Sequence, residues 1–490
     1  MNPLLCVTAA APTMAELCRA RDDAFATGGA DLVEMRLDHA DRPDVAAALA
    51  GRKGPVILTC RAAWEGGRFS GSEEERRRIL EQAMQAGAEY VDVEAAAGFA
   101  ADLIAARRAR GIVVSRHQFD APPREVESAY RHLRGLGADV AKLAVAVDRL
   151  TDMLPLLELG QQDDEPHVLL AMGAAGVASR VLATRLRNRW TFAGDGVAPG
   201  QLSADRMLRH LHFRRIRPDA TLYGVTGNPV MHSRSPIMHN AGFAALGLNA
   251  VYLPLEAADA ADIAAFMRAL DFKGISITAP FKVTLMPFVD ELTDVARRVG
   301  AINTTVVRNG RWIGDNTDVE GFLAPLAGVP LRGNRTCVLG GGGAARAVAI
   351  ALADSGADLL ISARRDDAAR EIAELAGGRV VAFPPPAKSW DVLINAIPAG
   401  PAAATESPMG HAPLDGRIVY DLVYEPEHTR LLVDARAAGC RTIGGLDMLI
   451  AQAERQFELW TGQRPAKGLF SSAARSVADR QPRPDAAQVL

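Results

Sequence analysis

A lysine at position 142 has the residue type and the setting of a nucleophilic amine. Lys142 lies in the apolar run Val140-Ala141-Lys142-Leu143-Ala144-Val145-Ala146-Val147. Burial disfavours the charged form of an amine and can lower its pKa by about 3 units from about 10.4. A neutral amine attacks carbonyl carbons, so this setting favours a Schiff-base lysine. The alternative interpretation is a lysine whose stem is buried and whose amine reaches solvent at a strand end.

Other ionisable side chains fall in or near the ends of neighbouring apolar runs. His117 ends the run Val113-Val114-Ser115-Arg116-His117 and is suited to acid/base catalysis near neutral pH. Arginine side chains are suited to bidentate binding of a carboxylate. Each such residue alone is more often structural, but the group favours carbanion or imine chemistry on a small anionic ketone. Its other members are Glu34, Arg36, Arg61, Glu94 and Arg180.

The first 215 residues contain the elements that would bring these side chains together. Eight short apolar runs alternate with segments of helical pattern. They cover residues 4–9, 32–37, 56–60, 90–93, 112–115, 140–145, 168–172 and 190–193. Alternation of strand and helix indicates a parallel sheet, and eight such units fit a small (β/α)8 TIM barrel. Active sites of such barrels lie at the carboxyl ends of the strands, where the ionisable residues fall.

The same residues carry a resemblance to type I 3-dehydroquinate dehydratase. Matching motifs occur in chain order over residues 4–215. They are Val33-Glu34-Met35-Arg36-Leu37-Asp38, Thr59-Cys60-Arg61 followed by Glu65-Gly66-Gly67, Val91-Asp92-Val93-Glu94, Ser115-Arg116-His117-Gln118-Phe119, Ala141-Lys142-Leu143-Ala144 and Ala198-Pro199-Gly200-Gln201. The resemblance implies that Lys142 forms an imine with the C3 ketone of 3-dehydroquinate, and that His117 moves the C2 proton. It implies that Glu94 orients His117.

The resemblance also implies a set of substrate-binding residues in this half. They are Thr8, Glu34, Arg36, Arg61, Arg180 and Gln201. The family usually has serine two residues before its Pro-Gly-Gln motif, where this chain has Val197. One hydrogen bond to the substrate is therefore expected to be missing or to come from a neighbouring group.

A glycine-rich loop in the second half fits the fingerprint of dinucleotide-binding sites. Gly340-Gly341-Gly342-Gly343-Ala344 follows a predicted strand at 336–339 and opens a predicted helix at 344–355. Glycines let the backbone approach a pyrophosphate, and the helix start supplies free N–H donors. The next strand ends in Ala363-Arg364-Arg365 where NAD-binding chains have an acidic residue, so NADP is favoured over NAD. A solvated charge cluster is the alternative, for Arg365 more than for Arg364.

The segment before the glycine loop carries hydroxyl, lysine and aspartate side chains. Ser233 and Ser235 stand in a proline-bounded loop, where they could bind a carboxylate or simply cap a turn and helix. Lys282 and Asp318 could relay a proton to an alcohol oxygen while hydride moves. Their separation in the sequence leaves open whether they meet.

Residues 222–475 resemble shikimate dehydrogenase. The resemblance rests on Asn228-Pro229, His232-Ser233-Arg234-Ser235-Pro236, Thr278-Ala279-Pro280-Phe281-Lys282, Gly300-Ala301-Ile302-Asn303-Thr304, Asn316-Thr317-Asp318, the glycine loop and Met448-Leu449 with Gln452-Ala453. It implies that Lys282 and Asp318 form the catalytic pair. It implies 3-dehydroshikimate binding by Ser233, Ser235, Thr278, Asn303, Tyr424 and Gln452. The implied NADP-binding residues are Gly340, Gly342, Gly343, Ala344, Arg364, Arg365, Asn395 and Gly445.

These patterns predict an α/β chain with the following division. Residues 1–215 form the barrel, 216–221 a linker, 222–325 a substrate-binding domain and 326–445 a Rossmann NADP-binding domain. Residues 446–476 are expected to form C-terminal helices that return to the substrate domain, and 477–490 a disordered tail.

Composition excludes several other classes for this 490-residue chain. Its net charge is -3 and no apolar run approaches a membrane span, so neither a nucleic-acid nor a membrane partner is expected. Five scattered cysteines, without a CxxC or Cys/His cluster, indicate no metal site and suit a reducing cytoplasm. A homodimer is compatible with the sequence.

Together the two resemblances imply consecutive reactions of the shikimate pathway, which makes aromatic amino acids. The first would dehydrate 3-dehydroquinate to 3-dehydroshikimate, and the second would reduce that product to shikimate with NADPH. Two alternatives remain. The second half could be a quinate/shikimate dehydrogenase that prefers NAD, or one half could be catalytically silent and serve binding or regulation.

Overall fold

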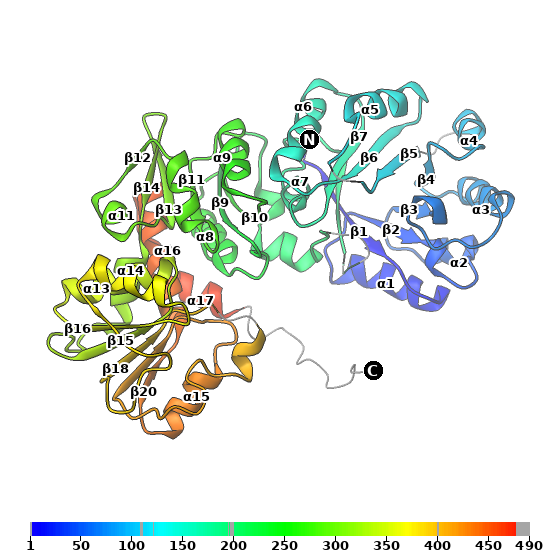
Figure 1. Ribbon diagram of the computed structural model, residues 1–490. Helices are drawn as coiled ribbons and strands as arrows, with labels where there is room; N and C mark the ends of the chain where they lie inside the picture. Colours follow the sequence, from blue (N-terminus) through cyan, green and yellow to red (C-terminus); the bar gives the residue numbers. More distant parts are fainter. Residues whose placement is uncertain are drawn as a thin grey trace. The chain divides into compact units, whose positions relative to one another are not determined.

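The computed structural model describes residues 2–107, 111–120, 122–194, 196, 200–398 and 401–476. These residues form three β-sheets with helices between their strands (Figure 1). It divides into two compact units, of which the first contains residues of 1–224, 229–232 and 247–271. The rest of the described chain belongs to the second unit. The tail at 477–490, predicted to be disordered, lies outside the described residues.

The first sheet is a nearly closed barrel of eight parallel strands. Their order is β7-β6-β5-β4-β3-β2-β1-β8, and β1 pairs with both β2 and β8. The strands are β1 (Leu4–Ala9), β2 (Leu32–Arg36), β3 (Val56–Thr59), β4 (Tyr90–Glu94), β5 (Gly111–Gln118), β6 (Val140–Ala146), β7 (His167–Met172) and β8 (Trp190–Ala193). All eight predicted strands are present, and the predicted barrel is confirmed.

Helices follow the strands around the barrel. They are α1 (Met14–Ala26), α2 (Val45–Leu49), α3 (Glu73–Gln85), α4 (Ala100–Ala106), α5 (Val126–Gly135), α6 (Leu154–Gln162) and α7 (Val177–Val181). Helix α3 starts where Ser72 and Glu75 form a capping box, in which each side chain binds the other residue's backbone N–H. The acidic first turn of α3 also complements the helix dipole.

The barrel interior changes from apolar to polar along the strands. Side chains alternate between the two faces of a strand, so residues two apart share a face. A buried cluster that includes Leu32, Ile57, Val113 and Val140 fills one level of the barrel. Two residues further along the same strands stand polar side chains: Glu34, Thr59, Ser115 and Lys142. Inside the barrel, the apolar level is therefore followed directly by a polar level nearer the carboxyl ends of the strands.

The second sheet has mixed strand directions and the order β10-β9-β11-β13-β14-β12. Strands β11 and β13 pair antiparallel, as do β13 and β14. Its strands are β9 (Thr221–Gly227), β10 (Ala250–Glu256), β11 (Gly274–Ile277), β12 (Glu291–Leu292), β13 (Thr304–Arg308) and β14 (Arg311–Asp315). The accompanying helices are α8 (Ser235–Ala245), α9 (Ala260–Ala269), α10 (Phe281–Thr284), α11 (Asp294–Val299) and α12 (Asp318–Leu323).

The third sheet is parallel and has the order β17-β16-β15-β18-β19-β20, which is the strand order of dinucleotide-binding Rossmann folds. Its strands are β15 (Arg335–Leu339), β16 (Asp358–Ser362), β17 (Arg379–Val380), β18 (Val392–Asn395), β19 (Ile418–Asp421) and β20 (Arg441–Ile443). The helices are α13 (Gly343–Asp354), α14 (Asp366–Ala376), α15 (Arg430–Ala437), α16 (Gly445–Thr461) and α17 (Leu469–Arg475). Helix α16 packs against α12, and α17 packs against α8.

Within the first unit, a buried carboxylate joins the barrel to helix α9. Asp262 is 1 % exposed and accepts hydrogen bonds from the backbone N–H groups of Leu150 (2.9 Å) and Thr151 (3.0 Å). The Thr151 hydroxyl donates a third bond at 2.8 Å. Leu150 and Thr151 follow strand β6, which carries Lys142. The loop after the lysine strand is therefore fixed to an element beyond residue 221.

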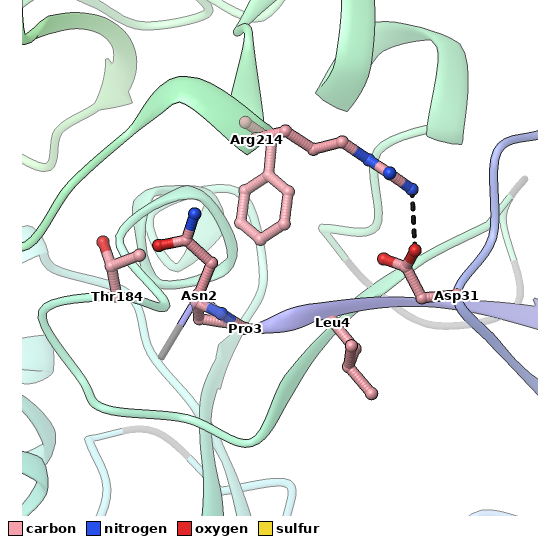
Figure 2. A pocket seen from close by; sticks show the side chains of 7 residues that line it. Asn2, Pro3, Leu4, Asp31, Thr184 and Arg214 are labelled. Carbon is pink, nitrogen blue, oxygen red and sulfur yellow. Dashed lines mark hydrogen bonds and ion pairs between the residues drawn. The ribbon is translucent and has the colours of Figure 1, made fainter.

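Two cavities of the first unit lie by the amino ends of barrel strands. One, of about 210 Å³, is lined by Asn2, Leu4 and Thr184 among others, and Figure 2 shows its rim, where Arg214 pairs with Asp31 at 2.9 Å. The other, of about 600 Å³, shares Asn2 and Thr184 with it. Neither is lined by the candidate catalytic residues. No helix in the described part of the chain is long and apolar enough to cross a membrane.

Two candidate active sites

Lys142 is buried in the polar layer of the barrel among carboxylates. It is 4 % exposed, and its Nζ lies 2.9 Å from Asp92 Oδ2 and 3.4 Å from Glu34 Oε1. The nitrogen also lies 4.6 Å from the centroid of the Phe192 ring. The amine thus points into the barrel rather than out to solvent, which removes the alternative of a lysine that reaches solvent.

Glu34 connects Lys142 to Thr8 and, through Thr8, to Gln201, which are both predicted substrate-binding residues. Its carboxylate accepts hydrogen bonds from Thr8 Oγ1 at 3.2 Å and from Thr59 Oγ1 at 3.0 Å. Gln201 Nε2 donates to Thr8 Oγ1 at 3.2 Å. Strands β1, β2 and β6 and the chain after β8 therefore bring Thr8, Glu34, Lys142 and Gln201 together.

Arg61 is the centre of an ion-pair network on the other side of Asp92. Its guanidinium lies 2.9 Å from Asp92 Oδ1 and 3.0 Å from Glu94 Oε1, and it donates to Ser115 Oγ at 2.7 Å. Arg76 of α3, which is 0 % exposed, also binds Glu94. The surrounding carboxylates outweigh burial and raise the pKa of Arg61, so it remains a cation.

His117 contacts Glu65, which is not among the site residues predicted from the sequence. Nδ1 of His117 lies 2.7 Å from Glu65 Oε1, and the His117 backbone N–H donates to the same oxygen at 2.9 Å. The prediction that Glu94 orients His117 is therefore wrong, because Glu94 is held by Arg61 and Arg76. The signal for Glu65 was its place four residues after Arg61 in a motif already noted.

Burial sets the charge states of the Glu65–His117 pair. Burial raises the pKa of Glu65 to about 7, against the opposing field of Arg61. Burial, with the cations Arg61 and Lys142, lowers the pKa of His117 well below 6.5. A protonated Glu65 places the imidazole proton on Nε2, whereas an ionised Glu65 accepts Nδ1–H and leaves Nε2 free as a base. Base-competent His117 therefore becomes abundant as the pH rises through about 7.

Glu65→Gln should change the acid side of the pH profile of a reaction that uses His117 as base. In the unaltered chain, kcat/KM should rise with pH up to an apparent pKa near 7, which belongs to the pair. The glutamine carboxamide does not ionise and accepts Nδ1–H at every pH, so the rise should move to lower pH by about one unit or more. The measurement is kcat/KM against pH for both proteins, and superimposable profiles would contradict the prediction.

Two other predicted residues of the barrel have different partners among the described residues. Arg36 forms a bidentate pair with Asp38 at 2.8 and 2.7 Å. Arg180 is buried and donates to the carbonyl of Ala171 at 3.2 Å, and burial lowers its pKa to about 10. Val197, where the family has serine, lies outside the described residues.

The second unit brings Lys282 and Asp318 into contact. Nζ of Lys282, on α10, lies 2.5 Å from Asp318 Oδ2 at the start of α12. Asn303 donates through Nδ2 to Asp318 Oδ1 at 2.8 Å and to Gln452 Oε1 at 3.4 Å. The question that the sequence left open is thus answered, and Asn303 and Gln452 lie in the same cluster.

The serine loop lies beside Tyr424. A hydrogen bond joins the Ser233 and Tyr424 side chains, and burial raises the pKa of Tyr424 to about 12. Ser233 Oγ also accepts from the backbone N–H of Ser235 at 3.2 Å, which is the turn role that the sequence left open. Thr278 is half-buried directly after β11, and its backbone N–H donates to Thr226 at 2.9 Å.

The glycine loop has the geometry of a phosphate cradle. Gly340 has φ +126°, which favours glycine, and a Cβ there would meet the Ala396 backbone at 3.1 Å. A Cβ on Gly342 would meet nothing within 4 Å, so open space adjoins the start of α13. A Cβ on Gly343 would lie 3.1 Å from the Lys282 side chain, so the loop adjoins the Lys282–Asp318 pair. Loop and helix start thus fit a pyrophosphate.

The remaining predicted cofactor-binding residues differ in their exposure to solvent and in their contacts. Arg364 and Arg365 are exposed after β16, where a 2′-phosphate could be bound. Asn395 is buried, donates to Asp421 Oδ1 at 2.9 Å and accepts from the Ile397 backbone. Gly445 begins α16, where a Cβ would meet the Leu422 carbonyl oxygen at 2.1 Å. Across the described residues, no three His, Cys, Asp or Glu side chains could hold a metal ion.

Comparisons with known proteins match both halves. Residues 5–218 match the family model of type I 3-dehydroquinase. Residues 225–305 match the substrate-binding domain of shikimate dehydrogenase, and 445–474 match the C-terminal domain of shikimate 5'-dehydrogenase.

Individual relatives cover one half or nearly the whole chain. A bifunctional 3-dehydroquinate dehydratase/shikimate dehydrogenase of Arabidopsis thaliana, chloroplastic by name, is 32 % identical over 90 % of this chain and 79 % of its own. An NADP(+) shikimate dehydrogenase of Chlorobaculum tepidum is 41 % identical over 49 % of this chain and 90 % of its own. The crystal structure of a shikimate dehydrogenase in complex with NADP+ covers 54 % of this chain and 97 % of its own, with 32 % identity and a TM-score of 0.50.

Proposed function

Because the chain belongs to the family of bifunctional 3-dehydroquinate dehydratase/shikimate dehydrogenases, we propose that it catalyses both reactions of the shikimate pathway. The barrel dehydrates 3-dehydroquinate to 3-dehydroshikimate, and the second half reduces that product to shikimate with NADPH. The observation that carries the proposal is the presence of two separate lysine centres in one chain: Lys142 among buried carboxylates, and Lys282 paired with Asp318 beside the glycine loop.

In the dehydratase half, Lys142 forms a Schiff base with the C3 ketone. Attack by its amine and loss of water give a protonated imine, which makes the neighbouring C2 proton acidic. His117 Nε2 accepts that proton while Glu65 holds Nδ1. The proton then leaves with the C1 hydroxyl as water, and hydrolysis of the imine frees Lys142. Thr8, Glu34 and Gln201, which already form one hydrogen-bonded chain, bind substrate hydroxyls.

In the reductase half, Lys282 and Asp318 deliver a proton to the carbonyl oxygen of 3-dehydroshikimate. Bound NADPH supplies the hydride for the carbonyl carbon. Asn303 fixes the Asp318 carboxylate through the bond at 2.8 Å, and Gln452 lies against Asn303. Ser233, Ser235 and Tyr424 bind the substrate carboxylate, supported by the Ser233–Tyr424 hydrogen bond. Gly342 and the start of α13 hold the pyrophosphate, and Arg364 with Arg365 holds the 2′-phosphate.

Arg364→Gln should weaken the binding of NADPH and leave the binding of NADH largely unaffected. A charge-assisted hydrogen bond is worth about 1.5–3 kcal/mol, so KM for NADPH should rise roughly 10- to 100-fold. NADH has no 2′-phosphate, so its KM should change little. Arg370→Gln, an exposed arginine on the following helix, is the matched control. An equal rise for both cofactors would contradict the assignment.

The domain boundaries and the cellular setting are part of the same proposal. We assign 1–215 to the dehydratase, 216–221 to a linker, 222–325 to substrate binding, 326–445 to NADP binding and 446–476 to the returning helices. The α16–α12 and α17–α8 contacts support the last assignment. We propose a cytoplasmic enzyme, supported by its five free cysteines, that acts without nucleic-acid or membrane partners. Self-association as a homodimer is tested by light scattering.

A coupled assay tests the function. The chain is mixed with 3-dehydroquinate and NADPH, and the loss of nicotinamide absorbance is followed. Oxidation of NADPH with shikimate identified by mass spectrometry is the expected result. If no NADPH is consumed, 3-dehydroshikimate is added directly. Activity at that point would place the failure in the barrel, and continued inactivity would refute the reductase assignment.

A further inference from the structure

Asp92 is the carboxylate nearest to the Lys142 amine. It lies on β4, two residues before Glu94, and is 1 % exposed. Its Oδ2 lies 2.9 Å from Nζ, closer than the 3.4 Å of Glu34. Glu34 also accepts two threonine hydroxyls, whereas Glu94 is neutralised by Arg61 and Arg76. The lysine charge is therefore balanced first by Asp92.

The surroundings of Asp92 fix both its orientation and its charge. Oδ1 accepts a hydrogen bond from Ser115 Oγ at 2.7 Å and lies 2.9 Å from the Arg61 guanidinium. Although burial alone would raise the pKa of Asp92, Arg61 and Lys142 hold it below its usual value. The carboxylate remains ionised at neutral pH, so it is a fixed negative charge rather than a proton acceptor.

The charge on the lysine nitrogen is the same before and after Schiff-base formation. A lysine ammonium and a ketone give a protonated imine and one water, which balances atoms and leaves one positive charge on nitrogen. A carboxylate placed 2.9 Å from the ammonium therefore serves equally for the protonated imine. We propose that Asp92 is the counter-ion of Lys142 in both states and keeps the imine nitrogen protonated during dehydration. This inference rests on the proposed Schiff base.

The other charged groups of the cluster do not replace Asp92. Glu34 lies farther from Nζ, at 3.4 Å, and Glu94 is held by Arg61 and Arg76. Glu65, which ionises as the pH rises through about 7, is held by His117. The titratable and charged groups around Lys142 and Asp92 are Cys6, Glu34, Arg36, Arg61, Glu65, Arg76, Glu94 and His117. Burial raises the pKa of Cys6 well above its usual value, so the thiol is neutral. Loss of Asp92 should therefore make the imine nitrogen easier to deprotonate.

Asp92→Asn tests the inference through the alkaline side of the pH profile. Only a protonated imine acidifies the adjacent C–H and is readily reduced by cyanoborohydride. In Asp92→Asn, the alkaline limb of dehydratase kcat should move to lower pH by about 1–3 units, the range of shift produced by a close opposite charge. The yield of the 3-dehydroquinate adduct, measured by the mass of the intact chain, should fall at about pH 9 more than at about pH 6.

Asp102→Asn is the matched control, because it removes the same charge from an exposed position on α4 of the same barrel. Reduction of 3-dehydroshikimate by the same chain reports whether each variant is folded. If the unaltered chain gives no adduct, the proposed Schiff-base mechanism is refuted. If it gives an adduct and Asp92→Asn keeps the same pH dependence, the counter-ion role is overturned.

A measurement on the unaltered protein covers the case in which Asp92→Asn does not fold. The chain is labelled with ¹⁵N at the lysine side-chain nitrogens, and the imine with 3-dehydroquinate is followed by NMR as the pH is raised. A protonated-imine resonance that persists at least one pH unit above that of a free lysine-analogue imine supports the inference. Deprotonation at the same pH as the free imine overturns it.

Discussion

Lys142→Met should abolish dehydration and leave the reductase active. The Nζ atom is the proposed attacking group and methionine has no replacement for it, so kcat should fall on the order of 10⁴-fold or more. Reduction of 3-dehydroshikimate depends on residues of the other unit and should be unchanged. The expected record is no NADPH oxidation from 3-dehydroquinate and full oxidation from 3-dehydroshikimate.

The same substitution removes the cation between Asp92 and Glu34, so its stability must be measured alongside. Breaking a buried ion pair by removing one partner costs about 3–5 kcal/mol. Lys53→Met, at an exposed lysine of the same barrel, is the control for the loss of a lysine. Cyanoborohydride with 3-dehydroquinate should add mass to the unaltered chain and to Lys53→Met but not to Lys142→Met. Dehydration that survives in folded Lys142→Met would refute the Schiff base.

Lys282→Met should abolish reduction and leave dehydration intact. General acid catalysis contributes about 10²–10⁴-fold, so kcat for reduction of 3-dehydroshikimate should fall by roughly that factor. The glycine loop keeps its backbone, and the part of Lys282 nearest to Gly343 is its aliphatic stem, where a Cβ built on Gly343 would lie 3.1 Å from Cβ and Cδ of the lysine, so NADPH affinity should change little. The measurements are kcat at saturating substrate and NADPH binding by fluorescence titration.

Two further variants sharpen that test. Lys388→Met removes an exposed lysine from the NADP-binding sheet region and should have no effect on kcat. Asp318→Asn leaves Lys282 in place but removes the carboxylate 2.5 Å from Nζ, and it should reduce kcat as well. A Lys282→Met protein with normal kcat and weakened NADPH binding would show that the lysine binds cofactor instead of moving a proton.

The strand pattern of the barrel could be predicted because burial on both faces leaves a strong signal. Parallel strands covered by helices read as continuous apolar runs, and Lys142 interrupts one of them. Once eight runs are placed, the carboxyl ends of the strands define one edge, which is why Glu34 and Lys142 could be assigned to one site. Thr8 and Gln201 were assigned to it only through the family resemblance. Lys282 and Asp318 could be named from motifs, but their contact depends on the path of the chain between them.

The carboxylate partner of His117 could not be predicted, because Glu65 and Glu94 both fall near the carboxyl ends of strands. Arg76 makes the difference, because it binds Glu94 and so leaves Glu65 as the partner of His117. The run Glu73-Glu74-Glu75-Arg76-Arg77-Arg78 reads as the solvated start of a helix, yet Arg76 is 0 % exposed and binds Glu94 inside. Asp92 was missed for a different reason. It shares the inward face of β4 with Glu94, but its role depends on the neighbouring Lys142 two strands away.

The hydrogen bonds around Asp262 constrain how this fused gene could ever be divided again. A stop codon in the proposed linker, residues 216–221, would encode a barrel that lacks Asp262. Each hydrogen bond to such a charged acceptor is worth about 1.5–3 kcal/mol, against a typical domain stability of about 5–15 kcal/mol. The segment that would lose these hydrogen bonds is the loop at Leu150 and Thr151, which follows the lysine-bearing strand β6. Fission into two working enzymes would therefore require compensating substitutions near Leu150, so the fusion resists reversal.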